Sequence, residues 1–443
     1  MLDVHHMHTR RCLLQRGLLG AASISGLATF LQQGWAAESA VPAAPAVGFG
    51  PLLKDPAGIF DLPSGFAYRI LSRSGTVMAD GWRLPGMMDG MASFAVGGKT
   101  VLVRNHEMPA SAKPTGPFQD RPLGDAASYD GMQPGGTTTV VIDPATGAVE
   151  REFLSLAGTL RNCAGGPTPW GSWISCEETT DRANAVLGKD HGFAFEVPAT
   201  LEPRLADPVP LAAMGRFRRE AVCVHAASGI VYQTEDDTHG CFYRFIPDQP
   251  RQLRSGGRLE ALRIRGFVGD TTNWTQRDIP VGQAMPVDWV PVDDRLGSPA
   301  AQAAERGAHR FTRGEGLWIH GDRMWFTATD GGAKRKGQIW QLERDVLTLF
   351  AEPDDAHLLE NGDNLVYAPW DDLIVCEDAA GSDADPGQHL VGITPTGRPY
   401  HLGRNRLNDS ELAGACFAPD GRTLFVNIQT PGLTFAITGP WKS

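Results

Sequence analysis

Six segments of the sequence repeat one pattern, and this repeat constrains the fold more than any other feature. Each has a turn containing glycine or aspartate, then a short apolar run, then a polar or acidic residue. Glycine and aspartate tolerate the positive φ of a hairpin turn, and β-branched and aromatic residues suit a strand. The turns and the runs that follow them lie at 96–99 and 100–107, 169–172 and 173–178, 227–229 and 230–237, 320–323 and 324–330, 369–372 and 373–378, and 419–422 and 423–429.

The six copies predict an all-β fold, a six-bladed β-propeller with inserted loops and short helices. The turns are irregularly spaced, so insertions must lie between some copies. In a propeller, equivalent strand ends from different blades converge near the axis, so acids far apart in sequence can meet there. A β-sandwich with solvated acidic turns is the alternative. It would not explain why acidic residues follow the apolar strands rather than alternate with them.

The first 37 residues differ in kind from the rest. Arg10 and Arg11 precede an apolar stretch between residues 17 and 30, and small residues follow at Ala36 and Ala37. This order is typical of a twin-arginine signal peptide cleaved near those alanines. A transmembrane anchor is the alternative, but the stretch is too short to span a bilayer. We expect a signal peptide at 1–37, one propeller domain at 38–443, and export by the twin-arginine machinery to the periplasm or medium without a membrane span.

Charge and cysteine content narrow the classes of function. The net charge is −11, and signal cleavage removes three arginines but only one aspartate, so the mature chain is more acidic. Nucleic acid is therefore not an expected partner, because binding a phosphate backbone needs a basic face. In an oxidising compartment the remaining cysteines could form disulfides, or stay as buried thiols of which one or more bind metal. These cysteines are Cys163, Cys176, Cys223, Cys241, Cys376 and Cys416.

One strand end combines a thiol with two carboxylates, Cys176-Glu177-Glu178. A thiolate among carboxylates repels them unless cations neutralise the group, which predicts a site for several metal ions. Oxygen ligands suit Ca²⁺, and a thiolate adds a softer position for iron or zinc. The candidate residues at strand ends and nearby are Asp89, Asn105, Glu107, Cys176, Glu177, Glu178, Glu220, Glu235, Asp237, Arg313, Glu315, Asp363, Asn364, Glu377 and Asp378.

Other catalytic signatures are missing from the sequence. There is no His-Glu-x-x-His motif, no Cys-x-x-Cys pair, no EF-hand loop, no Gly-x-Ser-x-Gly elbow and no phosphate-binding P-loop. Serine-hydrolase and nucleotide-hydrolase functions are therefore disfavoured.

Several long stretches of the chain resemble the PhoX-type alkaline phosphatases, which are exported propellers with a calcium and iron cofactor. The resemblance implies hydrolysis of small phosphomonoesters to inorganic phosphate, in the service of phosphate acquisition, at a Ca/Fe cluster in the propeller funnel. The matching stretches cover most of the mature chain and lie at 104–107, 135–139, 158–178, 215–237, 314–318, 363–378 and 411–441.

The resemblance also implies roles for individual residues. Two ferric ions bridged by oxide would be held by Glu107, Cys176, Glu220 and Glu315. Several calcium ions would be held by Glu177, Glu178, Glu235 and Glu377, with Asn364 or nearby carbonyls. Arg313 would bind phosphate, because a guanidinium matches two phosphate oxygens in one plane. The chain departs from the family at Arg219, where the family usually has histidine, and this puts any role of that histidine in doubt.

The expected reaction is attack of a metal-bound oxide or hydroxide on the phosphorus, without a covalent phosphoenzyme. Three alternatives remain open on the same fold: a phosphodiesterase, a calcium-dependent lactonase-like hydrolase, and a non-catalytic binding propeller that calcium only stabilises. Substrate preference would depend on loops such as Gly266 to Arg306.

Overall fold

The computed structural model describes residues 47–120, 123, 127–131, 133–355, 357–379 and 387–442. The predicted signal peptide at 1–37 and the first residues of the predicted domain, 38–46, lie outside this range. Among the described residues, no helix has the length and apolar character needed to cross a membrane.

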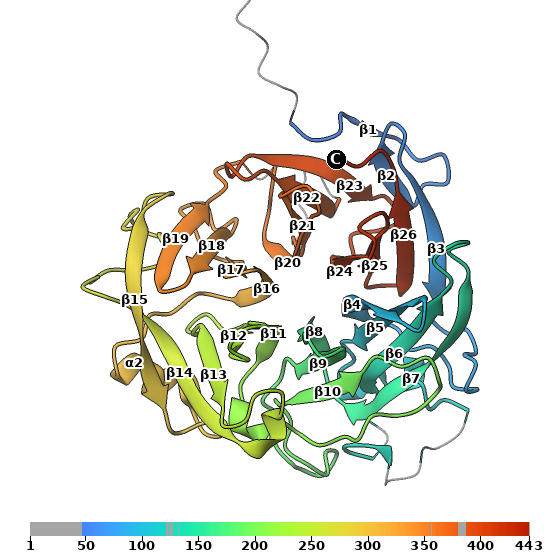
Figure 1. Ribbon diagram of the computed structural model, residues 1–443, viewed down its shortest axis with the longest axis horizontal. Coiled ribbons are helices and arrows are strands. Elements are labelled where there is room, and N and C mark those ends of the chain that lie inside the picture. Colours follow the sequence, from blue (N-terminus) through green and yellow to red (C-terminus); the bar gives the residue numbers. More distant parts are fainter. Residues whose placement is uncertain are drawn as a thin grey trace, which may run out of the picture. The chain divides into compact units, whose positions relative to one another are not determined.

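The described chain is built from antiparallel β-sheets arranged around a common centre, in a propeller-like manner (Figure 1). β-Branched runs such as Thr137 to Val141 in β6 favour the extended backbone, because these side chains are stiff and pack well on a pleated surface. One four-stranded sheet contains β4 (Met88–Val96), β5 (Lys99–His106), β6 (Gly135–Ile142) and β7 (Val149–Thr159). A three-stranded sheet contains β8 (Asn162–Pro167), β9 (Ser172–Glu177) and β10 (Ala194–Pro198).

The largest sheet has nine strands in the order β11-β12-β13-β14-β15-β19-β18-β17-β16. Its first half is β11 (Arg219–Val224), β12 (Val231–Glu235), β13 (Tyr243–Pro247), β14 (Gly257–Ile264) and β15 (Ala284–Val292). Its second half is β16 (Gly314–His320), β17 (Arg323–Ala328), β18 (Gln338–Glu343) and β19 (Val346–Ala351). Strand β15 pairs with both β14 and β19, and it thereby joins two four-stranded ladders into one sheet.

The last two sheets bring together the two ends of the described chain. A six-stranded sheet contains β1 (Leu52–Leu53), β2 (Phe60–Pro63), β20 (Gly362–Tyr367), β21 (Leu373–Glu377), β22 (His389–Ile393) and β23 (Pro399–Asn405). A four-stranded sheet contains β24 (Leu412–Phe417), β25 (Leu424–Ile428), β26 (Leu433–Thr438) and β3 (Ala67–Arg73). Because β3 pairs with β26, the first part of the chain completes the last sheet. The helices are short: η1 (Ala110–Thr115), η3 (Ala212–Met214), η4 (Leu253–Ser255) and α2 (Pro299–Glu305).

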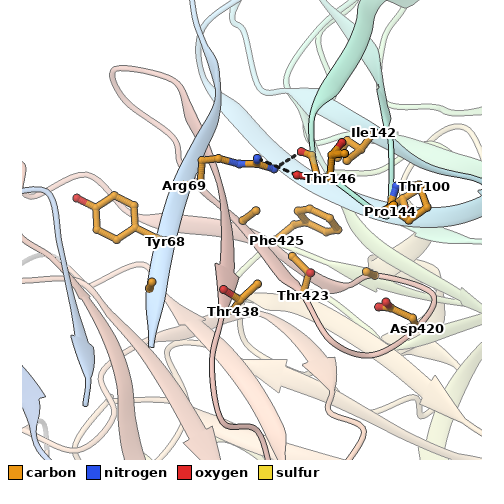
Figure 2. A pocket seen from close by; sticks show the side chains of 15 residues that line it. Tyr68, Arg69, Thr100, Ile142, Pro144, Thr146, Asp420, Thr423, Phe425 and Thr438 are labelled. Carbon is orange, nitrogen blue, oxygen red and sulfur yellow. Dashed lines mark hydrogen bonds between the residues drawn. The ribbon is translucent and has the colours of Figure 1, made fainter. Parts of the chain in front are cut away.

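A cavity of about 420 Å³ lies where β3 meets the turn between β6 and β7 (Figure 2). The Arg69 guanidinium crosses it and donates hydrogen bonds to the carbonyls of Thr146, at 3.3 Å, and Gly147. These bonds tie the last sheet to the first, so the cavity marks a junction between neighbouring sheets.

All six apolar runs predicted from the sequence are strands. They are β5, β9, β12, β17, β21 and β25, and each is the second strand of its ladder. The all-β, propeller-like fold is confirmed. The prediction of six separate blades is met only in part, because the strands form five hydrogen-bonded sheets and β15 merges two ladders.

The first strands of the ladders surround the centre and contact one another in a ring (Figure 1). They are β4, β8, β11, β16, β20 and β24. In five of them the register breaks between the first and the fourth residue, for example between Gly314 and Leu317 in β16, and in β24 it breaks between Ala413 and Cys416. Such a bulge releases residues from the ladder and re-aims their side chains.

Candidate metal centre

The first residue that each bulge releases from the ladder occupies the same place in the repeat, directly after the last paired residue before the break. Five of the six carry a side chain that can bind metal, and all five are buried. They are Asp89 in β4, Cys163 in β8, Glu220 in β11, Glu315 in β16 and Asp363 in β20, whereas β24 has Gly414. The repeat therefore gathers side chains from five strands at one level of the ring.

A second set of acids follows the second strand of four of the six ladders by one residue. Glu107 follows β5, Glu178 follows β9, Asp236 follows β12 and Asp378 follows β21. Ligand atoms of Asp89, Glu107 and Cys163 lie within 4.8 Å of one another, as do those of Cys163, Glu178 and Glu220. The Cys163 thiol thus belongs to both groups. We call the two sets, together with Glu411, the acidic cluster.

The acidic cluster stores unfavourable electrostatic energy when it holds neither protons nor cations. Burial, opposed by Arg161 and reinforced by Glu178, raises the pKa of Glu107 to about 8. Burial and the Asp378 charge raise the pKa of Asp363 to about 7. Burial and neighbouring acids also raise the pKa well above the ordinary value for Asp89, Cys163, Glu220, Glu315 and Glu411. Bound cations would remove this repulsion.

The donor set fits metal ions. Glu220 Oε1 is buried and has no hydrogen-bond partner among the described residues, so a ligand outside the protein can satisfy it. Carboxylate oxygens from several strands suit hard cations such as calcium, and one thiol at their centre provides a softer position.

Three guanidinium groups border the acidic cluster, and each bridges two acids. Arg161 contacts Glu107 at 2.8 Å and Glu178 at 2.7 Å. Arg218 contacts Glu178 and lies 3.6 Å from Asp236. For Glu178, burial raises the pKa, but Arg161 and Arg218 outweigh it, so its pKa lies below the ordinary value.

Arg313 continues this series at the next innermost strand. Its Nε donates to Asp236 at 3.0 Å, its NH2 contacts Glu315, and Asp378 lies 3.9 Å away. The side chains of Arg161 and Arg313 are 35% exposed and that of Arg218 is 43% exposed. All three can therefore meet a ligand from solvent while they contact the buried acids.

Four of the residues expected to bind metal lie in the acidic cluster: Glu107, Glu178, Glu220 and Glu315. Three others, Glu177, Glu235 and Glu377, are the last residues of β9, β12 and β21, and each accepts hydrogen bonds from neighbouring strands or loops. Glu177 accepts from His191 Nδ1 at 2.6 Å and from backbone N–H groups of Leu160, Gly192 and Phe193. Glu377 accepts from the backbone of Glu360 and His389, and Glu235 accepts from Tyr243 Oη at 2.6 Å. These three carboxylates are thus engaged by donors of the protein, and their binding of calcium stays a prediction.

Cys176 is not brought into the acidic cluster. Its side chain packs in an apolar group with Ile174, Ala194 and Val222, and its sulfur belongs to neither of the two ligand groups described above. Asn364 lies beside the cluster, where it donates to Asp363 Oδ1 at 2.9 Å and accepts from the Gly414 N–H at 2.8 Å. All six cysteines in the described part of the chain are free and buried, so the thiol alternative is the one found.

Arg219, the departure from the family pattern, has a structural role. It is fully buried, lies over the Phe217 ring at 4.1 Å, and donates to Gln233 Oε1 and to the carbonyls of Met214 and Gly215. Its hydrogen bonds thus hold the loop before β11 rather than the acidic cluster.

The sequence interpretation missed Cys163, Asp236, Glu411, Arg161 and Arg218 as members of the centre. One signal could have found part of this set. Ligand-type residues recur one or two places before a glycine at the start of the first strand, as in Asp89-Gly90, Cys163-Ala164-Gly165 and Glu315-Gly316.

The fold and the site define a propeller-like protein with a buried cluster of carboxylates and one thiol, bordered by arginines, which is the arrangement of a candidate multi-cation centre. The family described as alkaline phosphatase PhoX matches residues 47–432, so the chain belongs to this family of phosphatases. A structure of Pseudomonas fluorescens PhoX in complex with vanadate, a transition state analogue, is similar, with a TM-score of 0.67 and 18% identity over 88% of this chain and 98% of that one. A Xanthomonas campestris gluconolactonase structure aligns with a TM-score of 0.37 and 14% identity over 89% of this chain and 99% of that one. No protein of curated function matches the chain in a sequence search.

Proposed function

We propose that this protein is a metal-dependent phosphomonoesterase, an alkaline phosphatase that releases inorganic phosphate from small phosphomonoesters. The observation that carries the proposal is the buried acidic cluster with its three bordering guanidinium groups. Membership of the PhoX family supports it, and so does the vanadate bound to the Pseudomonas fluorescens relative, because vanadate imitates a phosphoryl group in transfer.

The acidic cluster is the proposed holder of the metal ions. We infer that Cys163, with Glu107, Glu178 and Glu220, provides the softer position suited to iron, and that the remaining carboxylates favour calcium. Several calcium ions and two ferric ions are the occupants that the family resemblance implies. Bound cations would supply charge neutralisation for the phosphate oxygens and for the leaving alkoxide.

The protein's own groups would bind and orient the substrate. In the absence of cations, the carboxylates engage Arg161, Arg218 and Arg313 in ion pairs. If the carboxylates bound cations, they would pair less strongly with the guanidinium groups. These groups would then be available for phosphate oxygens, to which they can donate pairs of parallel hydrogen bonds. Because all three arginines lie on neighbouring ladders, they define one side of the cluster as the phosphate-binding side.

The test is elemental analysis of the purified protein, combined with hydrolysis of p-nitrophenyl phosphate before and after chelation and after calcium is returned. We expect iron and calcium, activity that is lost on chelation, and recovery with calcium. The variant Arg313→Ala should lower kcat/KM by about 100-fold at unchanged metal content, because it removes a charged contact to the phosphate. A metal-loaded protein that hydrolyses no phosphomonoester would overturn the proposal.

We also propose that the architecture is a six-bladed propeller, spanning 38–443 as one domain. Six innermost strands with the same bulge support this count, with β15 as a link between two blades. The Arg10-Arg11 pair supports export by the twin-arginine pathway to the periplasm or medium. Cell fractionation tests this proposal, since replacing both arginines with lysine should retain the protein in the cytoplasm, and undiminished export would contradict it.

A further inference from the structure

A cavity of about 470 Å³ opens between the segment 239–241, the loop 269–271 and the segment 304–310. Its lining includes the charged or polar side chains of His239, Asp270, Thr271 and Arg310. A cavity of this size is large enough for a small organic ligand, and its few polar groups would fix the orientation of that ligand.

Two short segments connect the cavity to the cluster. The Arg313 N–H donates to the Asp237 carbonyl at 3.0 Å, and the Phe311 N–H donates to the Gly240 carbonyl at 2.8 Å. The segments 236–241 and 310–313 therefore run side by side. Asp236 and Arg313 lie at the cluster end of these segments, and His239 and Arg310, which line the cavity, lie three residues away from them in the sequence.

The polar groups of the cavity are a donor–acceptor set. Arg310 NH2 lies 2.8 Å from Asp270 Oδ2, and the two side chains remain 31% and 35% exposed. The His239 side chain is 76% exposed. Arg310 also lies over the Trp274 ring, 5.1 Å from its centroid. A carboxylate that accepts hydrogen bonds, next to a guanidinium and an imidazole that donate them, is suited to neighbouring hydroxyl groups.

The wall that carries Asp270 and Thr271 is held rigidly. The buried Asn273 side chain donates to the Ile279 carbonyl at 2.7 Å and to Glu352 Oε2 at 2.6 Å, and it accepts from the Ile279 N–H at 3.0 Å. Thr271 Oγ1 donates to the Arg310 carbonyl across the cavity. A cavity whose wall is fixed before binding loses little conformational entropy when a ligand enters.

We propose that this cavity binds the polyhydroxylated alcohol part of a sugar phosphate while the phosphate lies at Arg313. The inference rests on the proposed phosphatase function and names its substrate class. In the reaction, the bond between phosphorus and the sugar oxygen breaks, a water oxygen bonds to phosphorus, and a water proton goes to the sugar alkoxide. The products are a free sugar and inorganic phosphate.

The experiment compares kcat/KM for glucose 6-phosphate and for p-nitrophenyl phosphate with the full-length, metal-loaded protein. We expect Arg310→Ala and His239→Ala each to lower kcat/KM for glucose 6-phosphate by about tenfold, and for p-nitrophenyl phosphate by less than about twofold. The His239→Ala variant should fold normally, because the exposed His239 side chain makes few packing contacts. Its effect on kcat/KM therefore cannot be attributed to misfolding. Arg254→Ala is the matched control, since Arg254 is an exposed arginine paired with Asp207 and lines no part of the cavity.

The outcomes separate the two proposals. Equal effects of the variants on both substrates, or no effect on either, would overturn the sugar-binding role while phosphatase activity stands. If the wild-type, metal-loaded protein hydrolyses neither substrate, the proposed function fails and the sugar-binding role fails with it. A selective loss for glucose 6-phosphate with unchanged metal content would support the assignment.

Discussion

Cys163 and Cys176 provide a matched pair of buried thiols on neighbouring strands. Cys163 lies among the carboxylates Asp89, Glu107, Glu178 and Glu220, whereas Cys176 packs among apolar side chains. We expect Cys163→Ser to lose iron and to lower phosphatase activity by about 100-fold, because a hydroxyl is a much weaker ligand for a soft cation than a thiolate. Metal analysis and p-nitrophenyl phosphate kinetics measure both effects.

The companion variant Cys176→Ser should behave differently. It places a hydroxyl in an apolar environment, which costs about 1–3 kcal/mol in the free energy of unfolding but leaves the metal content unchanged. Denaturant unfolding measures that cost. Loss of iron from Cys176→Ser, with full iron in Cys163→Ser, would show that Cys176 rather than Cys163 binds the iron. That result would contradict the site described above.

The sequence could not separate these two cysteines, for a physical reason. Both lie in predicted strand segments beside residues that are common at strand ends, Cys163 before Ala164-Gly165 and Cys176 before Glu177-Glu178. What distinguishes them is the bulge between Asn162 and Gly165, which leaves Cys163 without a ladder partner, while Cys176 keeps a regular partner in Ala194. Bulges depend on how neighbouring strands pack, and the sequence of one strand does not reveal them.

At the scale of the strand, the pairs Glu177-Glu178, Glu235-Asp236 and Glu377-Asp378 show both the success and the limit of prediction. Strand positions and the convergence of acids at their ends follow from turn chemistry and apolar runs. Successive residues of a strand point in opposite directions, so only one acid of each pair can face the cluster. A shift of one residue at the strand end would exchange the acid that faces the cluster for its neighbour. In Glu177-Glu178 and Glu377-Asp378, the first acid accepts hydrogen bonds from backbone N–H groups instead.

The bulge glycines allow innermost strands to approach closely, and this gives a prediction at the same scale. A Cβ at Gly316 would lie 2.2 Å from the Asp363 carbonyl oxygen of the adjacent strand. We expect Gly316→Ala to separate β16 from β20, to lower the free energy of unfolding by about 2–3 kcal/mol, and to weaken cation binding by displacing Glu315. Calcium titration and urea unfolding would measure these changes.

Gly86→Ala is the control for this strand variant. A Cβ at Gly86 meets no atom within 4 Å, so its stability should change by less than about 1 kcal/mol. Equal stability and equal calcium affinity for Gly316→Ala and Gly86→Ala would show that close strand approach does not position the cluster.

At the scale of the whole molecule, the acidic cluster couples folding to pH. The pKa of Glu107 rises from 4.5 to about 8 on folding, and that of Asp363 rises from 3.8 to about 7. At a pH between its unfolded and its folded pKa, each of these carboxyl groups has lost its proton in the unfolded chain but keeps it in the metal-free folded chain. The free energy of unfolding of the metal-free protein should therefore fall as pH rises from about 4 to about 8, by about 1 kcal/mol per pH unit or more.

Bound cations should reverse this dependence, so that the free energy of unfolding rises with pH. They bind the ionised carboxylates in the folded protein, where they displace protons, and they do not bind the unfolded chain. Urea unfolding across this pH range, with chelator and then with excess calcium, measures both slopes. In Glu107→Gln the metal-free slope should be shallower, since one titrating group is removed. If the metal-free protein instead gains stability with rising pH, its buried carboxylates are already ionised in the folded state, and the ring of strands must tolerate their repulsion without cations.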